Sequence, residues 1–379
     1  MGRDVIGVGV LGYGWISRAH ARALHALNHV APLPKRVRLV SIAGRRPEPL
    51  ESAARELGFE RWTTSWEELL DDSDVDVVAN LTAVEGHAEP TLAALQRGKS
   101  VLCEKPLGVD AAESHQLFEA AEEAEVTHAC GFNYRYVPAV TLAHDLVHAG
   151  RLGELRHYRA LYLQDYAVAG GQTRSSGGAG AVLDYSHLVD MLRWFAGEPR
   201  SVLAQTASFV SEVDDAYAAI LDLQGGAVAT LEASRCALGW KGRHRVELNG
   251  SEGSLWWDME DINRLHVFIG ADEQEGIGGF RDVLVTQPDH PYLAEWWPSG
   301  HVLGWEHSFV HQWRDFLGSV LEGSPVPERQ ASFEDGYRAS VLCEAILASA
   351  REGRAVAIDE PEGALAGGHV RRHDQEGSA

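Results

Sequence analysis

The feature that most constrains the fold is an apolar run, Val5 to Leu11, which breaks into Gly12-Tyr13-Gly14 and continues as a helical pattern to about Asn28. A strand, a glycine turn and a helix in this order form the context of a dinucleotide-binding fingerprint. The glycines permit a tight turn and a close approach of the backbone to a pyrophosphate, which the helix N-terminus attracts. Ser17 stands where a third glycine is usual, so we expect slightly looser packing of this helix on its strand.

The next hundred residues alternate between apolar runs and helical patterns. This alternation predicts a parallel sheet with helices on both faces, that is, a doubly wound α/β Rossmann domain, which we assign to residues 1–132. Its further strands are predicted at Val37–Ala43, Val75–Ala79, Ser100–Cys103 and Val126–Gly131, and helices near Pro47–Leu57, near Ser65–Leu70 and up to Ala94.

The character of the sequence changes after Gly153, where strand-like runs dominate. They predict a second, α+β domain of residues 133–365 with a large, mainly antiparallel open sheet. Its strands are predicted at His157–Leu163, Val202–Phe209, Ala216–Leu223, Val228–Ala233, Arg245–Leu248 and Ser254–Trp257. Its helices are predicted near Pro138–Ala149, up to Phe195, and near Glu306–Leu321 and Glu334–Arg351. Residues 366–379 are predicted to form a polar, disordered tail.

The composition excludes several classes of partner. The formal net charge is −22 at pH 7, and nucleic acids and anionic membranes both require basic patches, so neither is expected to bind. The chain has no apolar run of about 18 residues, and its N-terminus lacks the apolar core of a signal peptide. The four cysteines are far apart, without the paired spacing of zinc or redox sites. We therefore predict no metal and expect a cytoplasmic location.

The second predicted strand ends in Gly44-Arg45-Arg46. An NAD site usually offers an acidic residue here for the ribose 2′-hydroxyl, whereas an arginine accommodates a 2′-phosphate. No acid occurs before Glu48, so Arg45 and Arg46 favour NADP over NAD. A solvated turn is the simpler alternative for these two arginines.

Two further segments carry groups suited to proton transfer. The strand Ser100–Cys103 ends abruptly in Glu104-Lys105-Pro106, and ligands bind outside the carboxyl ends of strands in open α/β sheets. Burial or a nearby cation lowers the pKa of a lysine, which suits such a residue to proton transfer near neutral pH. Pro106 restricts Lys105 to extended conformations, and we predict a cis Lys105–Pro106 bond. Asp184 and His187 are three residues apart, so both can lie on one helical face.

These segments together resemble the Gfo/Idh/MocA family, whose glucose–fructose oxidoreductase and inositol dehydrogenase relatives oxidise or reduce sugars and cyclitols with NAD(P). The resemblance covers nearly the whole chain and rests on Gly12-x-Gly14, Asn80-Leu81-Thr82 with His87, Glu104-Lys105-Pro106 and Asp184-Tyr185-Ser186-His187, in that order. Residues 131–139, 162–166 and 290–301 resemble a narrower branch of levoglucosan and related sugar dehydrogenases. One departure is that many members place the histidine four residues after the aspartate, not three.

The resemblance implies a role for each matching residue. Lys105 and His187 would form the acid–base pair at the substrate hydroxyl, and Asp184 would hold or polarise this pair. A carboxylate beside His187 would fix its tautomer and raise its pKa. Cofactor contacts are implied for Gly12, Tyr13, Gly14, Trp15 and Ile16 at the pyrophosphate, for His87 and Glu104 at the nicotinamide half, and for Leu81, Thr82 and Lys105. Substrate contacts are implied for Lys105, Asn133, Arg135, Tyr162, Gln164, Asp184 and His187.

The predicted protein is thus an NAD(P)-dependent dehydrogenase of a small carbohydrate or cyclitol, forming a homodimer or homotetramer through its second sheet. A relative that retains its dinucleotide and cleaves a glycoside by transient oxidation would need the same residues. A non-catalytic dinucleotide sensor could dispense with Lys105 and His187, yet both are present. A zinc-dependent alcohol dehydrogenase is a weaker alternative, because His307 and His311 are one turn apart but lack the glutamate of a zinc-protease motif.

Overall fold

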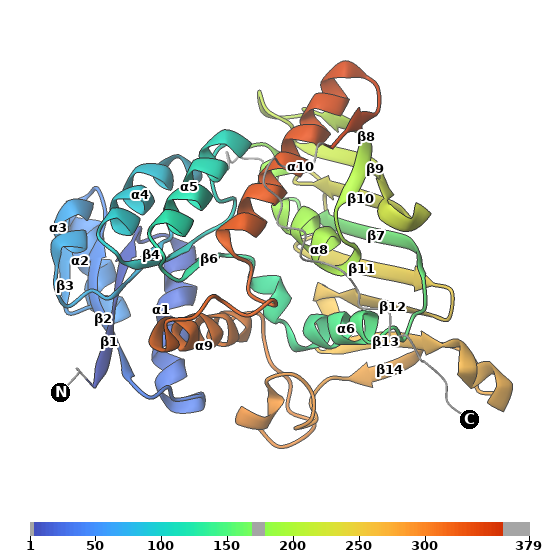
Figure 1. Ribbon diagram of the computed structural model, residues 1–379, viewed down its shortest axis with the longest axis horizontal. Coiled ribbons are helices and arrows are strands. Elements are labelled where there is room, and N and C mark those ends of the chain that lie inside the picture. Colours follow the sequence, from blue (N-terminus) through green and yellow to red (C-terminus); the bar gives the residue numbers. More distant parts are fainter. Residues whose placement is uncertain (1–3, 169–178, 359–379) are drawn as a thin grey trace, which may run out of the picture.

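The structure, a computed structural model, describes residues 4–168 and 179–358. It contains a six-stranded and a nine-stranded sheet, which lie in the left and right halves of Figure 1. The predicted tail, and Gly177 and Gly178 ahead of Asp184, lie outside the described residues. Among the described helices, none has the length and apolar character needed to cross a bilayer.

The first sheet is parallel throughout and has the order β3-β2-β1-β4-β5-β6. The chain order therefore reverses between β1 and β4, and ligands bind at such a switch point in doubly wound sheets. β3 is not predicted from the sequence, because this edge strand has only three residues and no apolar run. The strands are β1 (Val5–Leu11), β2 (Arg36–Ala43), β3 (Arg61–Thr63), β4 (Val77–Asn80), β5 (Ser100–Cys103) and β6 (His128–Cys130).

Helices cover both faces of this sheet, which confirms the doubly wound prediction. One face packs against α1 (Trp15–Val30), α2 (Pro47–Leu57) and α9 (His307–Glu322). The other packs against α3 (Trp66–Asp71), α4 (Ala88–Gln96) and α5 (Ala111–Glu123). Helix α9 comes from late in the chain and returns to lie on α1. The domain limits at residues 132 and 365 stay predictions.

The second sheet is mainly antiparallel, as predicted, and has the order β14-β13-β12-β11-β7-β10-β9-β8-β15. Its one parallel pair in the described residues joins β7 to β10. The strands β13, β14 and β15 are not among the predicted ones. The bounds are β7 (Leu155–Leu163), β8 (Pro199–Ala207), β9 (Ala216–Leu223), β10 (Val228–Ser234), β11 (Arg243–Gly250), β12 (Gly253–Asp258), β13 (Arg264–Ile269), β14 (Arg281–Leu284) and β15 (Val356–Ala357).

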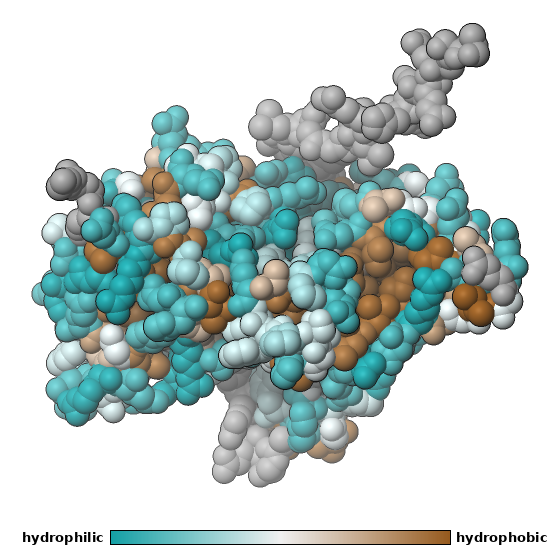
Figure 2. Space-filling model, turned by 90° about the horizontal axis from the view of Figure 1, so that it is seen from below, coloured by the Kyte–Doolittle hydropathy of each residue, from teal (hydrophilic) through white to brown (hydrophobic). Residues whose placement is uncertain are grey.

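Helices cover one face of the second sheet: α6 (Pro138–His148), α7 (Ala181–Asp184), α8 (Ser186–Ala196) and α10 (Phe333–Glu352). Strand β9 alternates buried and exposed residues, as a strand with one covered face does. On the other face Leu203 is 46 % exposed and Ile220 54 % exposed. Figure 2 shows hydrophobic surface gathered on the half of the molecule that this sheet occupies.

One prediction about this region needs correction. Asp184 and His187 do not share a continuous helix, because α7 ends at Asp184 and α8 begins at Ser186. Tyr185 between them has φ −95° and ψ 27°, outside the helical range, and this residue turns the chain.

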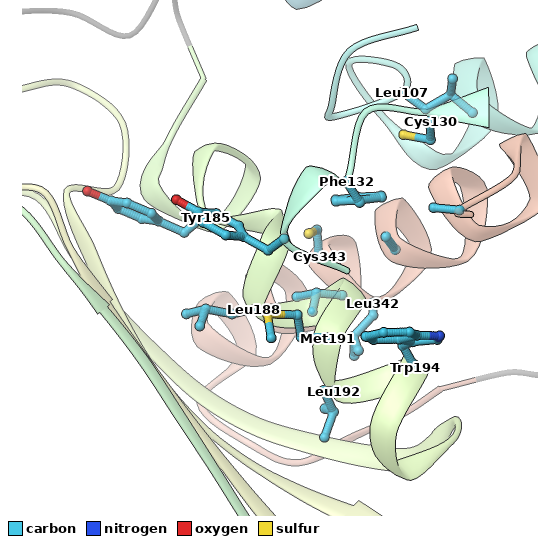
Figure 3. Packing of buried hydrophobic residues seen from close by; sticks show 14 of the residues in the cluster. Leu107, Cys130, Phe132, Tyr185, Leu188, Met191, Leu192, Trp194, Leu342 and Cys343 are labelled. Atoms are coloured by element: carbon cyan, nitrogen blue, oxygen red, sulfur yellow. The ribbon is translucent and has the colours of Figure 1, made fainter. Parts of the chain in front are cut away.

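A continuous core joins the two sheets and fixes α8 in place. Leu188 and Met191 of α8 belong to one buried cluster with Leu342 of α10 and with Phe132, which follows β6; Figure 3 shows part of this cluster. Fully burying a leucine, methionine or phenylalanine contributes about 1.5–3 kcal/mol each. The first turn of α8, which carries His187, is therefore held rigidly beside the carboxyl end of the first sheet.

Candidate active site

The turn between β1 and α1 is shaped to admit a phosphate-bearing ligand. Gly12 has φ +94°, and a Cβ there would lie 2.8 Å from the Leu81 carbonyl oxygen, so only glycine fits. A Cβ at Gly14 would meet no described atom within 4 Å, which leaves open space at the helix N-terminus. No described side chain caps α1, so its first N–H groups remain available. These residues fit the pyrophosphate of a dinucleotide.

Ser17, which stands in place of the third glycine, stabilises this turn. Its hydroxyl donates to the Gly12 carbonyl at 3.1 Å, and the residue is fully buried. Serine is thus small enough to be enclosed here, and its hydroxyl has a partner. The slightly looser helix packing that we expected from Ser17 stays a prediction.

Arg45 and Arg46 follow Gly44 at the carboxyl end of β2. Both are exposed, and Nε of Arg46 donates to the Tyr13 hydroxyl at 3.3 Å. Tyr13 in turn packs against Gly44, where a Cβ would come within 2.4 Å of its ring. Both arginines thus face solvent, and Arg46 contacts Tyr13.

Trp15 and Ile16 begin helix α1. Trp15 is 71 % exposed and stacks on Trp305, with ring centroids 5.8 Å apart. Trp305 also meets Phe309 edge-on at 4.8 Å. Ile16 is half-buried and packs against the core between the sheet and α9.

His87 is a structural brace rather than an open ligand contact. The residue is 1 % exposed, and its ring nitrogens lie 2.9 Å from the Pro106 carbonyl and 3.2 Å from that of Thr82. Burial lowers its pKa, although these carbonyls oppose the shift. His87 thus ties the segment of Leu81 and Thr82, next to Gly12, to the segment after Lys105.

Glu104 is held by a buried relay of hydrogen bonds. The Trp313 indole donates to Nδ1 of His20 at 2.9 Å, so the proton of neutral His20 must be on Nε2. Nε2 then donates to Oε1 of Glu104 at 3.1 Å, and the Lys105 backbone N–H donates to Oε2 at 3.1 Å. Both carboxylate oxygens are engaged, which fixes Glu104 next to the end of β5.

Lys105 joins the two domains. The Lys105–Pro106 bond is cis, which confirms the prediction. The Lys105 ammonium donates to the Asp184 carbonyl at 2.7 Å and lies 3.6 Å from Oδ1 of the same residue. The Tyr166 hydroxyl donates to the other carboxylate oxygen at 2.5 Å. Asp184 therefore holds the lysine while Tyr166 holds Asp184.

His187 differs from our expectation. We predicted that a carboxylate beside it would raise its pKa, but Asp184 binds Lys105 and Tyr166 instead. Burial, followed by the positive charge of Lys105 and the neighbouring His244 ring, lowers the pKa of His187 well below its usual range. The residue is 7 % exposed, and its Nδ1 has no hydrogen-bond partner among the described residues. Its imidazole is therefore neutral at pH 7.

Aromatic residues surround His187. Tyr134 meets His187 edge-on at 4.6 Å, and its hydroxyl is 2.8 Å from that of Tyr162. Tyr162 stacks on His244 at 4.7 Å with ring planes 3° apart. Burial raises the pKa of Tyr162 well above its usual range, so it stays a neutral hydrogen-bonding group. Gln164, two residues along the strand direction, donates to the Lys241 carbonyl at 3.1 Å.

The structure does not bring Asn133 and Arg135 into this cluster as open side chains. The Asn133 amide donates to Ser308 at 2.8 Å. The Arg135 guanidinium is 2 % exposed, donates to Asp190 at 2.9 Å and lies 3.3 Å from Asp335. Burial alone would lower the pKa of Arg135, but the two carboxylates raise it. Arg135 thus neutralises buried acids instead of facing a substrate pocket.

Sequence reasoning missed three residues of the site. Tyr166 carries a signal, since Tyr162, Gln164 and Tyr166 follow at intervals of two and can share a side of an extended chain. His20 and His244 carry none, because each lies within an element and reaches the site only through tertiary packing. The zinc alternative fails at His311, whose two nitrogens are taken by the Trp296 indole at 2.8 Å and the Tyr136 carbonyl at 3.0 Å.

The first domain is a Rossmann domain with a turn that admits a phosphate, and Lys105 at its strand ends binds Asp184 of the open-sheet domain, next to the buried His187. This arrangement defines a dinucleotide-dependent oxidoreductase. Comparison with known proteins agrees. Residues 6–132 match the "Oxidoreductase family, NAD-binding Rossmann fold" and residues 140–256 match the "GFO/IDH/MocA C-terminal domain". The chain belongs to the Gfo/Idh/MocA family of oxidoreductases, as its motifs indicated.

Individual relatives match over nearly the whole chain. Levoglucosan dehydrogenase of Pseudarthrobacter phenanthrenivorans is 32% identical over 91% of this chain and 96% of its own. Myo-inositol 2-dehydrogenase of Thermotoga maritima is 27% identical over 93% of this chain and 98% of its own. A solved levoglucosan dehydrogenase in complex with NADH and levoglucosan has a TM-score of 0.88 at 32% identity, covering 94% of this chain and 100% of that one.

Proposed function

We propose that this protein transfers a hydride between NAD(P) and a secondary hydroxyl of a sugar, anhydrosugar or cyclitol. The observation that carries the proposal is the meeting of Lys105, at the carboxyl end of β5, with Asp184 and the first turn of α8, which bears His187. The nicotinamide cofactor, when bound, supplies the hydride acceptor or donor. The protein supplies the proton transfer and the orientation of the hydroxyl.

The two basic groups have different tasks in this mechanism. His187 is neutral at pH 7 and buried, so it can accept the hydroxyl proton of an alcohol substrate. The ammonium of Lys105, held by Asp184, can donate a hydrogen bond to the same oxygen and stabilise negative charge that develops on it. In the reverse direction, the protonated imidazole returns its proton to the substrate oxygen.

The substrate class follows from the residues around Lys105 and His187. Tyr162 and Tyr134 offer hydroxyls beside aromatic faces, and Gln164 and Asp184 offer polar groups near them. Hydroxyl-rich rings with apolar C–H faces match such a mixture of hydrogen-bonding and aromatic groups. Relatives named for levoglucosan and inositols support this class.

For the cofactor, we propose that NADP is accepted at least as well as NAD. Arg45 and Arg46 are exposed at the end of β2, and no acidic side chain precedes Glu48 there. A 2′-phosphate near these guanidinium groups would form charge-assisted hydrogen bonds. The bound NADH of related structures supports dinucleotide use in general and leaves this preference a proposal.

We further propose a homodimer or homotetramer through the open face of the second sheet, and action in the cytoplasm, where NAD(P) is available. That face holds a groove of about 830 Å³ whose lining includes Leu161, Leu203, Ile220, Thr230 and Glu232. Exposed apolar side chains on a broad sheet face suit an isologous interface, in which each copy buries the same residues.

A panel of pyranoses, anhydrosugars and inositols, each with NAD and with NADP, tests the proposed function. Reduced nicotinamide should accumulate in proportion to the oxidised product, as read by its absorbance. Product that forms without net reduction of the cofactor would support the redox-neutral glycosidase alternative and contradict the dehydrogenase.

A further inference from the structure

A cluster outside the active site combines three groups that bind metals. His144 and His148 end helix α6, one turn apart, and Glu328 belongs to the segment between α9 and α10. One potential ligand atom from each of the three residues lies within 4.8 Å of the others. We propose that these residues bind a single transition-metal ion, Zn²⁺ being the best match, which joins α6 to residues 324–330.

His144 is the rigid member of the cluster. Its ring stacks on Trp194 of α8, with centroids 3.8 Å apart and planes at 9°. The residue is 8 % exposed, and its Nε2 is buried without a hydrogen-bond partner among the described residues. A buried polar atom without a partner is destabilising, so a partner for this nitrogen is expected. A metal ion beside it would supply that partner.

His148 is oriented as a metal ligand. Its Nδ1 is 3.1 Å from the His144 carbonyl and donates to it, which fixes the tautomer and leaves a lone pair on Nε2. Metal-binding histidines commonly donate the proton of their other ring nitrogen to a backbone carbonyl in this way. The ring of His148 stacks on that of His144, with centroids 3.8 Å apart.

Only a small rearrangement of side chains is needed for the three residues to bind a zinc ion. Zinc–nitrogen bonds of about 2.0–2.1 Å place two ligands roughly 3.3 Å apart in a tetrahedral site. His148 and Glu328 are both exposed, so rotation of their side chains can close the cluster around the fixed His144. Two imidazoles and one carboxylate leave the fourth position for water, and this donor set favours zinc over the oxygen-seeking Ca²⁺ and Mg²⁺.

Neighbouring charges are compatible with a cation. Arg135 is paired with the buried acids Asp190 and Asp335. Arg329 lies over the Tyr292 ring and 3.9 Å from Asp315. Asp145 of α6 lies 3.9 Å from His144 and adds negative charge. The cluster therefore presents a carboxylate and two imidazoles, while the adjacent guanidinium groups have anionic partners of their own.

The test is calorimetric titration of the metal-free, full-length protein with zinc chloride, for the wild type and for His148→Ala and Glu328→Gln. We expect one site in the wild type, weakened about tenfold or more in each variant by loss of a ligand. Zinc in excess should also raise the wild-type melting temperature by about 2 °C or more, since it binds only the folded state. Sugar oxidation should be unchanged in both variants.

His115→Ala is the matched control, because this histidine also lies one turn from a carboxylate, 3.5 Å from Glu119, but the described structure places no third ligand group with them. It should leave zinc affinity unchanged. Equal affinity in the wild type and His148→Ala, or equal weakening in His115→Ala, would overturn the site. An unchanged affinity in Glu328→Gln would overturn the assignment of Glu328.

Discussion

The two domains prepare their halves of the site in different ways. In the first domain, Glu104 and His87 have hydrogen-bond partners for every side-chain oxygen or nitrogen. Among residues 4–132 no buried side-chain nitrogen or oxygen lacks such a partner. In the second domain, Nδ1 of His187 and both ring nitrogens of His244 are buried without described partners. The cofactor half is complete by itself, whereas the substrate half is not.

This difference suits the two halves of the site to different tasks. A fully bonded set of groups is rigid and holds one geometry, which suits recognition of an invariant cofactor. A buried polar group without a partner is costly, and a hydroxyl-rich substrate that supplies the missing partner recovers that free energy on binding.

The largest effects on turnover are expected for Lys105 and His187, where the cofactor half and the substrate half of the site meet. Lys105→Ala and His187→Ala should each lower turnover by roughly 100-fold or more, the usual scale for loss of an acid–base group. Steady-state kinetics with saturating sugar measures this loss. Dinucleotide binding, followed by fluorescence titration, should persist in both variants, because the turn at Gly12 and Gly14 is intact.

The double variant tests whether the two residues act together. Their charges interact, since Lys105 lowers the pKa of His187. The combined loss should therefore be much smaller than the product of the two single losses. Multiplicative losses would show that the two groups act independently and would contradict a shared proton-handling unit.

Tyr166 should have the next largest effect, acting through Asp184. Its hydroxyl donates to the carboxylate that holds Lys105, so Tyr166→Phe frees Asp184 to move and should lower turnover about tenfold. The pH–rate profile should shift as well, because the charge near Lys105 is repositioned. Tyr337→Phe on α10, away from Asp184, is the control and should change neither quantity. A lower melting temperature with an unchanged profile would mark Tyr166 as merely structural.

Replacing Arg45 and Arg46 should have a more modest effect on cofactor preference. Both residues are exposed, so solvent screens their interactions with a 2′-phosphate. Replacing both with alanine should raise KM for NADP several-fold and leave KM for NAD nearly unchanged. The measurement is initial rates with each cofactor at a fixed sugar concentration. A wild type that uses only NAD would show that these arginines are a solvated turn.

The cofactor half was also the more predictable half. The turn at Gly12, the strand before Lys105 and the cis bond follow from local patterns, because strand, glycine and proline act on neighbouring residues. The alternation of strands and helices likewise predicts the doubly wound sheet. The three-residue edge strand β3 was not predicted, since it depends on pairing with β2 rather than on its own sequence.

The substrate half depends on contacts that no local pattern encodes. The link from Asp184 to Lys105 instead of His187 arises because Tyr185 breaks the helix, which sequence spacing alone does not reveal. His244 reaches Tyr162 only because β11 pairs with β7 in one particular register. Side chains assembled across a sheet become neighbours through register, so their roles appear only in three dimensions.

The smallest predicted effect concerns His244 and the pH dependence of stability. The residue is fully buried, and burial lowers its pKa to about 3 from an ordinary value near 6.5. Between these values the unfolded chain binds a proton that the folded chain does not, so the free energy of unfolding falls as pH falls. One such histidine lowers that free energy by about 1 kcal/mol at pH 6 relative to pH 8, and by more at lower pH. The contribution is fully present above pH 6.5.

His244→Phe should therefore remove this part of the acid sensitivity while keeping a ring to stack on Tyr162. It should also be slightly stabilising at pH 8, since it removes two buried nitrogens that lack partners among the described residues. Urea unfolding from pH 5.5 to 8 measures both effects, with replacement of the exposed His301 as the control. An unchanged slope with pH would mean that a hydrogen-bond acceptor beside His244 keeps its pKa near the ordinary value in the folded protein, and that the substrate half is less incomplete than its hydrogen bonds indicate. Weaker sugar binding in the same variant would instead show that the open nitrogens of His244 serve the substrate.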